Sequence, residues 1–213
     1  KLLTEVKTTP FNEDEIEKIL IISELIRKRL RNSNGTIIIP NIPNMDKWFL
    51  KVVAHDLGRL KAEIDNYTKE NSKYRKFFYI TFASIIRKVS NADDQSPKPY
   101  VSTRFKKQEL NVTMTFFHYF EKFLEKIKEF SSLKCLGKAY LIGDDARNIT
   151  RDIKGKIQLA ITSPPYINAF DYVRSLKLEN LWLCNIEYDC LLELRHKHIG
   201  TENIAMKSKE IPE

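Results

Sequence analysis

Apolar residues in the first 130 positions recur mainly with the period of a helix. Over residues 13–31 they follow helical spacing at Ile16, Ile19, Leu20 and Ile26. Asn12 precedes this run and Glu15 follows three residues later, which is the capping-box arrangement of a helix N-terminus. The pattern predicts a helix over residues 13–31, ended by the turn-forming "NSNGT".

Three further segments are predicted to be helical. The first covers residues 46–67, with Gly58 as a weak point in its middle. The second covers residues 72–90 and the third about 108–131. Both carry one apolar face rich in phenylalanine, which we interpret as core. The short run "TIIIP", residues 36–40, is expected to be extended.

A polar loop without periodicity is expected between the last two of these helices, over residues 91–107. It is longer than the connections that compact domains usually keep without a purpose. Basic and aromatic side chains alternate in it, so it is a candidate phosphate-contacting loop; a solvated flexible loop is the alternative. The predicted DNA-binding residues are Lys98, Tyr100, Arg104, Lys106 and Lys107.

The pattern changes after residue 133. Two short apolar runs, residues 139–142 and 157–162, are each followed by polar residues and then by a helical pattern. This predicts an open α/β sheet in residues 133–213, joined to a mainly helical region in residues 1–132. In such sheets ligands bind at the carboxyl ends of the strands.

The second run leads into Ser163-Pro164-Pro165-Tyr166. Two prolines remove two backbone donors and make the corner rigid. The Ser163 hydroxyl and the Pro164 carbonyl could then accept hydrogen bonds from one exocyclic amine, and Tyr166 offers a ring for stacking. A strand-to-helix turn with an exposed tyrosine is the alternative.

"TSPPY" after an apolar run resembles the signature of the amino-group DNA methyltransferases, which methylate cytosine N4 or adenine N6 with S-adenosyl-L-methionine. "IIRKVSNADDQSPKPYVS", "LIGDDAR" and "DYVRSLKLENLWL" resemble the regions around that signature in one group of these enzymes. The resemblance covers roughly residues 80–200. It implies part of a Rossmann-like methyltransferase sheet, with a large helical region N-terminal to the SPPY strand.

The resemblance also implies a role for each residue of the signature. Ser163 and Pro164 would hold the target amine, Pro165 would hold the corner, and Tyr166 would stack on a flipped base. A serine in the first position looks more like the cytosine-N4 enzymes than the adenine-N6 enzymes.

The cofactor part of the resemblance is incomplete. Asp144 and Asp145 would lie near the cofactor's adenine, with helix capping as their alternative role. The family's glycine-rich FxGxG loop has no counterpart, because no two of the six glycines are close together. We therefore expect an N-terminal segment or a second chain to supply that loop.

Composition bears on the partners. A net charge of +8 favours polyanions, and double-stranded DNA is the expected partner. No apolar run approaches the roughly 20 residues of a membrane span. Cys135, Cys184 and Cys190 form no CxxC pair, so we expect a reducing, cytoplasmic setting and no metal site.

The sequence thus predicts a site-specific DNA methyltransferase or a fragment of one, cytosine N4 favoured over adenine N6. The resemblance also implies a cognate restriction endonuclease, and the isolated chain could be inactive without the cofactor motif. Two alternatives remain: a non-catalytic DNA-binding or specificity module, and a methyltransferase that acts on RNA or a protein amide.

Overall fold

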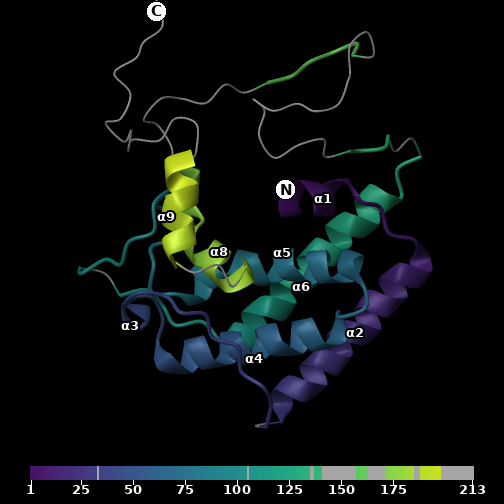
Figure 1. Ribbon diagram of the computed structural model, residues 1–213. Helices are drawn as coiled ribbons and strands as arrows, with labels where there is room; N and C mark the ends of the chain where they lie inside the picture. Colours follow the sequence, from purple (N-terminus) through teal and green to yellow (C-terminus); the bar gives the residue numbers. More distant parts are fainter. Residues whose placement is uncertain are drawn as a thin grey trace, which may run out of the picture.

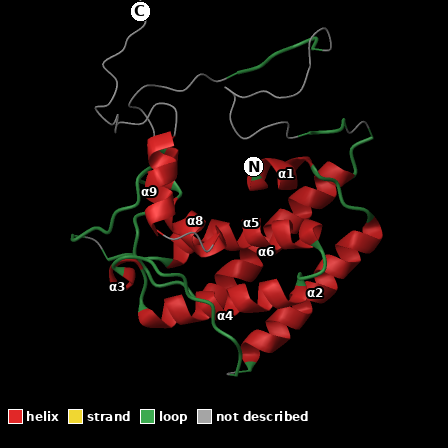
Figure 2. Ribbon diagram, viewed as in Figure 1, coloured by secondary structure: helices red, strands yellow, loops and turns green. Residues whose placement is uncertain are grey.

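The computed structural model describes residues 1–32, 34–104, 106–134, 137–140, 157–162, 171–184 and 188–197. Every regular element in these residues is a helix, as Figures 1 and 2 show. The helices are α1 (Leu2–Thr8), α2 (Glu13–Arg31), α3 (Met45–Trp48), α4 (Lys51–Tyr67), α5 (Ser72–Val89), α6 (Val112–Ser131), α7 (Tyr172–Ser175), α8 (Lys177–Cys184) and α9 (Tyr188–Lys197).

The N-terminus of α2 is the predicted capping box. The Asn12 side chain accepts from the Glu15 amide at 2.8 Å, and the Glu15 carboxylate accepts from the Asn12 amide at 2.9 Å. The Lys73 Nζ of α5 bonds both Glu15 oxygens, at 2.7 and 2.6 Å. The helix predicted over residues 13–31 is confirmed, and its cap also ties α2 to α5.

The other predicted helices are found with altered boundaries. The 72–90 helix is confirmed as α5, and the helix expected from about 108 begins at Val112, because the Asn111 side chain caps it by accepting from the Met114 amide at 2.9 Å. The segment predicted as one helix over 46–67 is two. Buried Phe49 lies between α3 and α4 with an extended backbone, which turns its ring into the core.

The core is built around α5, which packs against α1, α4, α6 and α8. Phenylalanines of α5 and α6 interlock there: Phe77 meets Phe120 edge to face, with ring centroids 5.7 Å apart, and Phe78 stacks on Phe120 at 5.5 Å. The core interpretation of these phenylalanines is confirmed.

Helix α8, which follows the SPPY region in sequence, joins the same core. Its Trp182 is fully buried, with its ring centroid 5.7 Å from that of Phe49 and 6.0 Å from that of Phe82. The division of the chain at residue 132 stays a prediction.

The predicted α/β fold is wrong for the described residues, which contain no strand. Residues 157–162 form no ladder, and Leu159 and Ile161 are 74% and 88% exposed. A strand needs a neighbour to take its backbone hydrogen bonds, and none lies beside this run in the described part. The described end of the 139–142 run, Ala139 and Tyr140, is likewise exposed and outside any strand.

Gly58 is a packing requirement rather than a weak point of α4. The segment 36–40, which has no regular secondary structure, lies against the helix there, and the Ile38 amide donates to the Gly58 carbonyl at 3.1 Å. A Cβ on Gly58 would lie 2.7 Å from Ile37 Cγ2 and 2.9 Å from Ile39 Cγ1. The missing side chain allows the segment to lie directly on the helix.

Replacing Gly58 by alanine is therefore expected to destabilise the fold. Overpacking should cost about 1–3 kcal/mol, which outweighs the gain of about 1 kcal/mol in helix propensity. Urea unfolding followed by circular dichroism measures the difference. Gly35→Ala is the control, because its Cβ would meet only Glu63 Oε1 at an ordinary 3.4 Å. A more stable Gly58→Ala variant would contradict the close contact.

The Glu15–Lys73 pair should make the stability of the fold depend on pH. Burial raises the pKa of Glu15, but the Lys73 ammonium and the Asn12 amide together hold it below its usual 4.5. A carboxylate with a lowered folded-state pKa stabilises the fold above its unfolded-state pKa, and this contribution is lost as the pH falls through the folded-state pKa.

We expect Glu15→Gln to lower the free energy of unfolding by about 0.5–1 kcal/mol at pH 7, since the pair is only partly buried. The difference from the unmodified protein should shrink as the pH falls below about 4. Denaturant titrations at pH 7 and pH 3 measure it, with exposed Glu17→Gln on the same helix as control. A difference independent of pH would exclude the charge as its cause.

Candidate functional site

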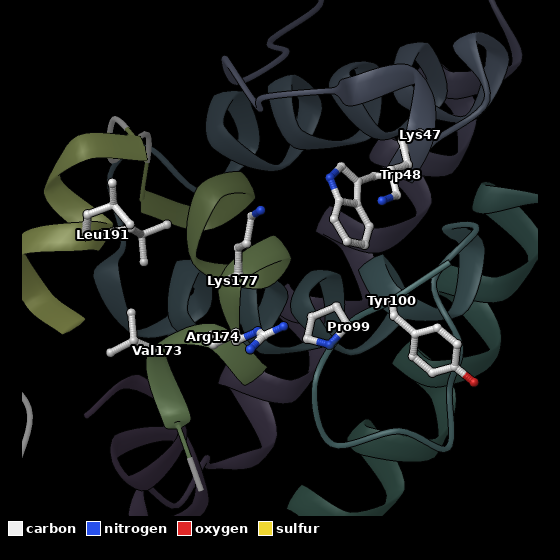
Figure 3. Close-up of a pocket in the computed structure, with 9 residues that line it drawn as sticks. Lys47, Trp48, Pro99, Tyr100, Val173, Arg174, Lys177 and Leu191 are labelled. Carbon is white, nitrogen blue, oxygen red and sulfur yellow. The ribbon is translucent and has the colours of Figure 1, made fainter. Parts of the chain in front are cut away.

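A pocket of about 380 Å³ opens where α3, the loop between α5 and α6, and helices α7, α8 and α9 meet (Figure 3). One wall is apolar, from Val173, Leu191 and Leu192. The opposite wall carries the rings of Trp48, Pro99 and Tyr100. The pocket thus combines residues from three separate parts of the sequence.

Three basic side chains line this pocket: Lys47, Arg174 and Lys177. The Nζ atoms of Lys47 and Lys177 lie 5.5 and 5.1 Å from the centroid of the Trp48 ring, within the range of cation–π attraction. None of the described residues that line the pocket is acidic. The pocket is therefore a concentration of positive charge against an aromatic surface.

The basic residues of this pocket act on one another. Burial lowers the pKa of Lys177, and the positive charges of Arg174 and Lys47 lower it further. An anion in the pocket would favour the charged form of all three groups. The arrangement can therefore hold a negatively charged group, such as a phosphate.

The loop that carries Tyr100 is ordered by its own side chains. The Asp93 carboxylate accepts from the amides of Ser96 at 2.9 Å and Gln95 at 2.8 Å, and these bonds lower its pKa. The Asp93 amide donates to the Tyr100 carbonyl at 2.9 Å, which closes the loop on itself. The expected irregular segment is found over residues 91–104 and 106–107, and it presents Tyr100 at the pocket.

Lys107 anchors this loop from inside. Its ammonium donates to the carbonyls of Arg87 at 2.6 Å and Ala92 at 3.0 Å, and to the Asp94 carboxylate at 2.5 Å. Burial lowers its pKa, while Asp94 acts in the opposite direction. A role of Lys107 in DNA contact stays a prediction, although three protein acceptors already surround its ammonium.

Arg87 joins the loop to the helices that follow the SPPY region. Its guanidinium donates to the Ser96 carbonyl of the loop and to the Ser175 carbonyl of α7, both at 2.9 Å. Its Nε lies 4.0 Å from the Glu179 carboxylate of α8. Burial raises the pKa of Glu179, and the positive charge of Arg87 opposes that shift. Arg87 therefore fixes the two sides of the pocket relative to each other.

The remaining residues singled out in the sequence fall into two groups. Lys98 is half-buried in the loop, and Arg104 and Lys106 are exposed on it, away from the pocket lining. The signature residues Ser163, Pro164, Pro165 and Tyr166 and the acidic pair Asp144 and Asp145 lie outside the described residues.

Sequence reasoning did not single out Lys47, Trp48, Arg174 or Lys177 as functional candidates. The only local signal is the spacing of Arg174 and Lys177, three residues apart and hence neighbours on a helical surface. The sequence alone does not predict that Lys47 and Lys177 lie beside the same Trp48 ring, because this arrangement depends on how α8 packs on α5.

The described residues contain no glycine-rich loop of the kind expected to approach S-adenosyl-L-methionine. Their three glycines are far apart in sequence: Gly58 is covered by the segment 36–40, Gly35 faces Glu63, and Gly137 has no neighbour within 4 Å of its Cβ position. The same part of the chain contains no group of three potential metal ligands. None of its helices is long and apolar enough to cross a membrane.

If Arg87 holds the loop as described, the planar shape of its guanidinium should stabilise the fold as well as its charge. Arg87→Lys should lose at least one of the carbonyl bonds that the guanidinium makes, and it should lower the free energy of unfolding by about 1–3 kcal/mol. Limited proteolysis should also cut the 91–107 loop faster. Exposed Arg31→Lys is the matched control. Unchanged cleavage and stability would show that Arg87 does not hold the loop.

The chain matches no protein-family model, and searches of curated proteins and of solved structures give no match.

Proposed function

We propose that this chain is the DNA-contacting part of a site-specific DNA methyltransferase, which acts on the exocyclic amine of a flipped base, with cytosine N4 favoured over adenine N6. One observation carries the proposal. The basic aromatic pocket is built partly by α7 and α8, which directly follow the SPPY region in sequence, and partly by the loop expected to contact DNA.

Charge supports DNA as the partner. Phosphate contacts dominate the affinity of proteins for DNA, and they come mainly from lysine and arginine. The pocket gathers three such residues beside two aromatic rings, in a chain with a net charge of +8. A phosphate held there would relieve the repulsion among the three cations.

The chemistry of the proposal rests on the SPPY resemblance. Ser163 and Pro164 would accept the hydrogens of the target amine, and Tyr166 would stack on the base. S-adenosyl-L-methionine would supply the methyl group. The glycine-rich part of its site would come from an N-terminal segment or from a second chain.

A second candidate is a non-catalytic DNA-binding or specificity module. The absence of a sheet from the described residues favours it, because the methyltransferase fold implied by the resemblance is built on one. It requires the same DNA contacts and no affinity for the cofactor.

The test is transfer of labelled methyl groups from S-adenosyl-L-methionine to duplex DNA, RNA and protein by the native protein, purified with any accompanying subunits. We expect transfer to DNA, reduced about 100-fold or more by Ser163→Ala and by Tyr166→Ala through lost positioning and stacking. Exposed Tyr140→Ala is the control for the second variant.

Unchanged transfer in both signature variants would remove SPPY from the mechanism. DNA binding without methyl transfer or cofactor affinity would favour the second candidate. Transfer to RNA or protein alone would reject DNA as the substrate.

A further inference from the structure

The pocket differs from a surface that only follows a duplex backbone. Its basic residues surround a concave space that also has aromatic and apolar walls. Its volume of about 380 Å³ lies in the range of about 300–1,000 Å³ that is usual for small-ligand sites. A phosphate contact alone needs neither the depth nor the apolar walls.

The two rings have different roles. Trp48 is 8% exposed and is flanked by the ammonium groups of Lys47 and Lys177, so its ring serves chiefly to hold those cations. Tyr100 is 49% exposed, and its hydroxyl points away from Arg174 and Lys177 (Figure 3). Its ring is thus the available stacking surface beside the positive charges.

The apolar wall of the pocket also suits the base or sugar of a nucleotide. Val173 of α7 and Leu191 and Leu192 of α9 face the pocket, and Leu192 is 39% exposed. Leu191 is only 3% exposed, so a base or sugar against this wall would cover apolar surface of Leu192 and the partly exposed Val173 that now contacts water. In a duplex the base faces are covered by stacking, so only an unpaired nucleotide can use both walls.

We propose that this pocket binds one unpaired nucleotide, with its phosphate among Lys47, Arg174 and Lys177 and its base on the ring of Tyr100. The inference rests on the proposed function, because it names the part of the DNA that this surface would hold. The same chemistry is shared by a nucleotide within a single strand and by a free mononucleotide.

Fluorescence anisotropy with a labelled single-stranded oligonucleotide and a duplex of equal length tests the proposal. At equal salt the single strand should bind more tightly than the duplex. Tyr100→Leu should weaken single-strand binding about tenfold, the loss of one stacked base. Lys177→Gln should lower the magnitude of the salt-dependence slope by about 0.7, the loss of one single-strand phosphate contact.

Matched controls lie outside the pocket. Lys122→Gln removes one exposed lysine of α6, and Tyr140→Leu removes an exposed tyrosine that does not line the pocket. Both should bind as the unmodified protein does, and circular dichroism should show that all four variants are folded. Equal loss in pocket and control variants would overturn the assignment to this pocket, as would duplex binding equal to single-strand binding.

Competition identifies what is recognised. A deoxynucleoside monophosphate should displace the oligonucleotide, whereas inorganic phosphate or a deoxynucleoside alone should do so far less. Phosphate that competes as well as the mononucleotide would overturn the stacking on Tyr100. A free mononucleotide that binds more tightly than the oligonucleotide would identify the free nucleotide as the source.

The inference and the proposed function can fail separately. Single-strand binding through Tyr100 and Lys177 without methyl transfer would reject the enzyme and retain the nucleotide pocket. Methyl transfer that is insensitive to Tyr100→Leu and Lys177→Gln would retain the enzyme and reject the pocket.

Discussion

The candidate site depends on the hydrogen bonds that the Arg87 guanidinium donates. The guanidinium is largely buried, so its positive charge must be answered by protein groups. The answering groups are carbonyls of the loop and of α7, together with the Glu179 carboxylate. These belong to segments far apart in sequence, and all converge on the last turn of α5. The Nη1 and Nη2 bonds of Arg87 thus tie the loop to α7 beside the pocket, whereas its buried Nε has no hydrogen-bond partner in the described part of the chain.

Much of the helical region could be predicted because its signals are local. The capping box at Asn12 and Glu15 and the phenylalanine faces of α5 and α6 lie within a few turns of one another. The break at Phe49 could not be predicted, because it depends on a ring entering a core formed by α5 and α8. The expected strand at 157–162 failed for a related reason. An apolar run indicates that a segment tends to be buried, but it does not indicate which other segment would cover it.

The candidate site was predictable only in part. The loop was correctly singled out, and Tyr100 does line the pocket. The lysines of the site and of the loop, however, cannot be distinguished in the sequence, although their different burial gives them different roles. The Lys107 ammonium is bonded inside the loop, while Lys47 and Lys177 lie on either end of a contact between distant segments. The charge of a residue follows from the sequence, but whether that charge is bonded inside the protein or faces a pocket depends on packing.

The placement of the two tryptophans has a spectroscopic consequence. The chain has only two, and they lie in contrasting surroundings: Trp182 in the dry core, Trp48 at the pocket between two ammonium groups. Emission from Trp182 should respond to loss of tertiary packing, and emission from Trp48 to the charge held beside it. The unlabelled protein thus contains separate optical reporters for folding and for occupancy of the pocket.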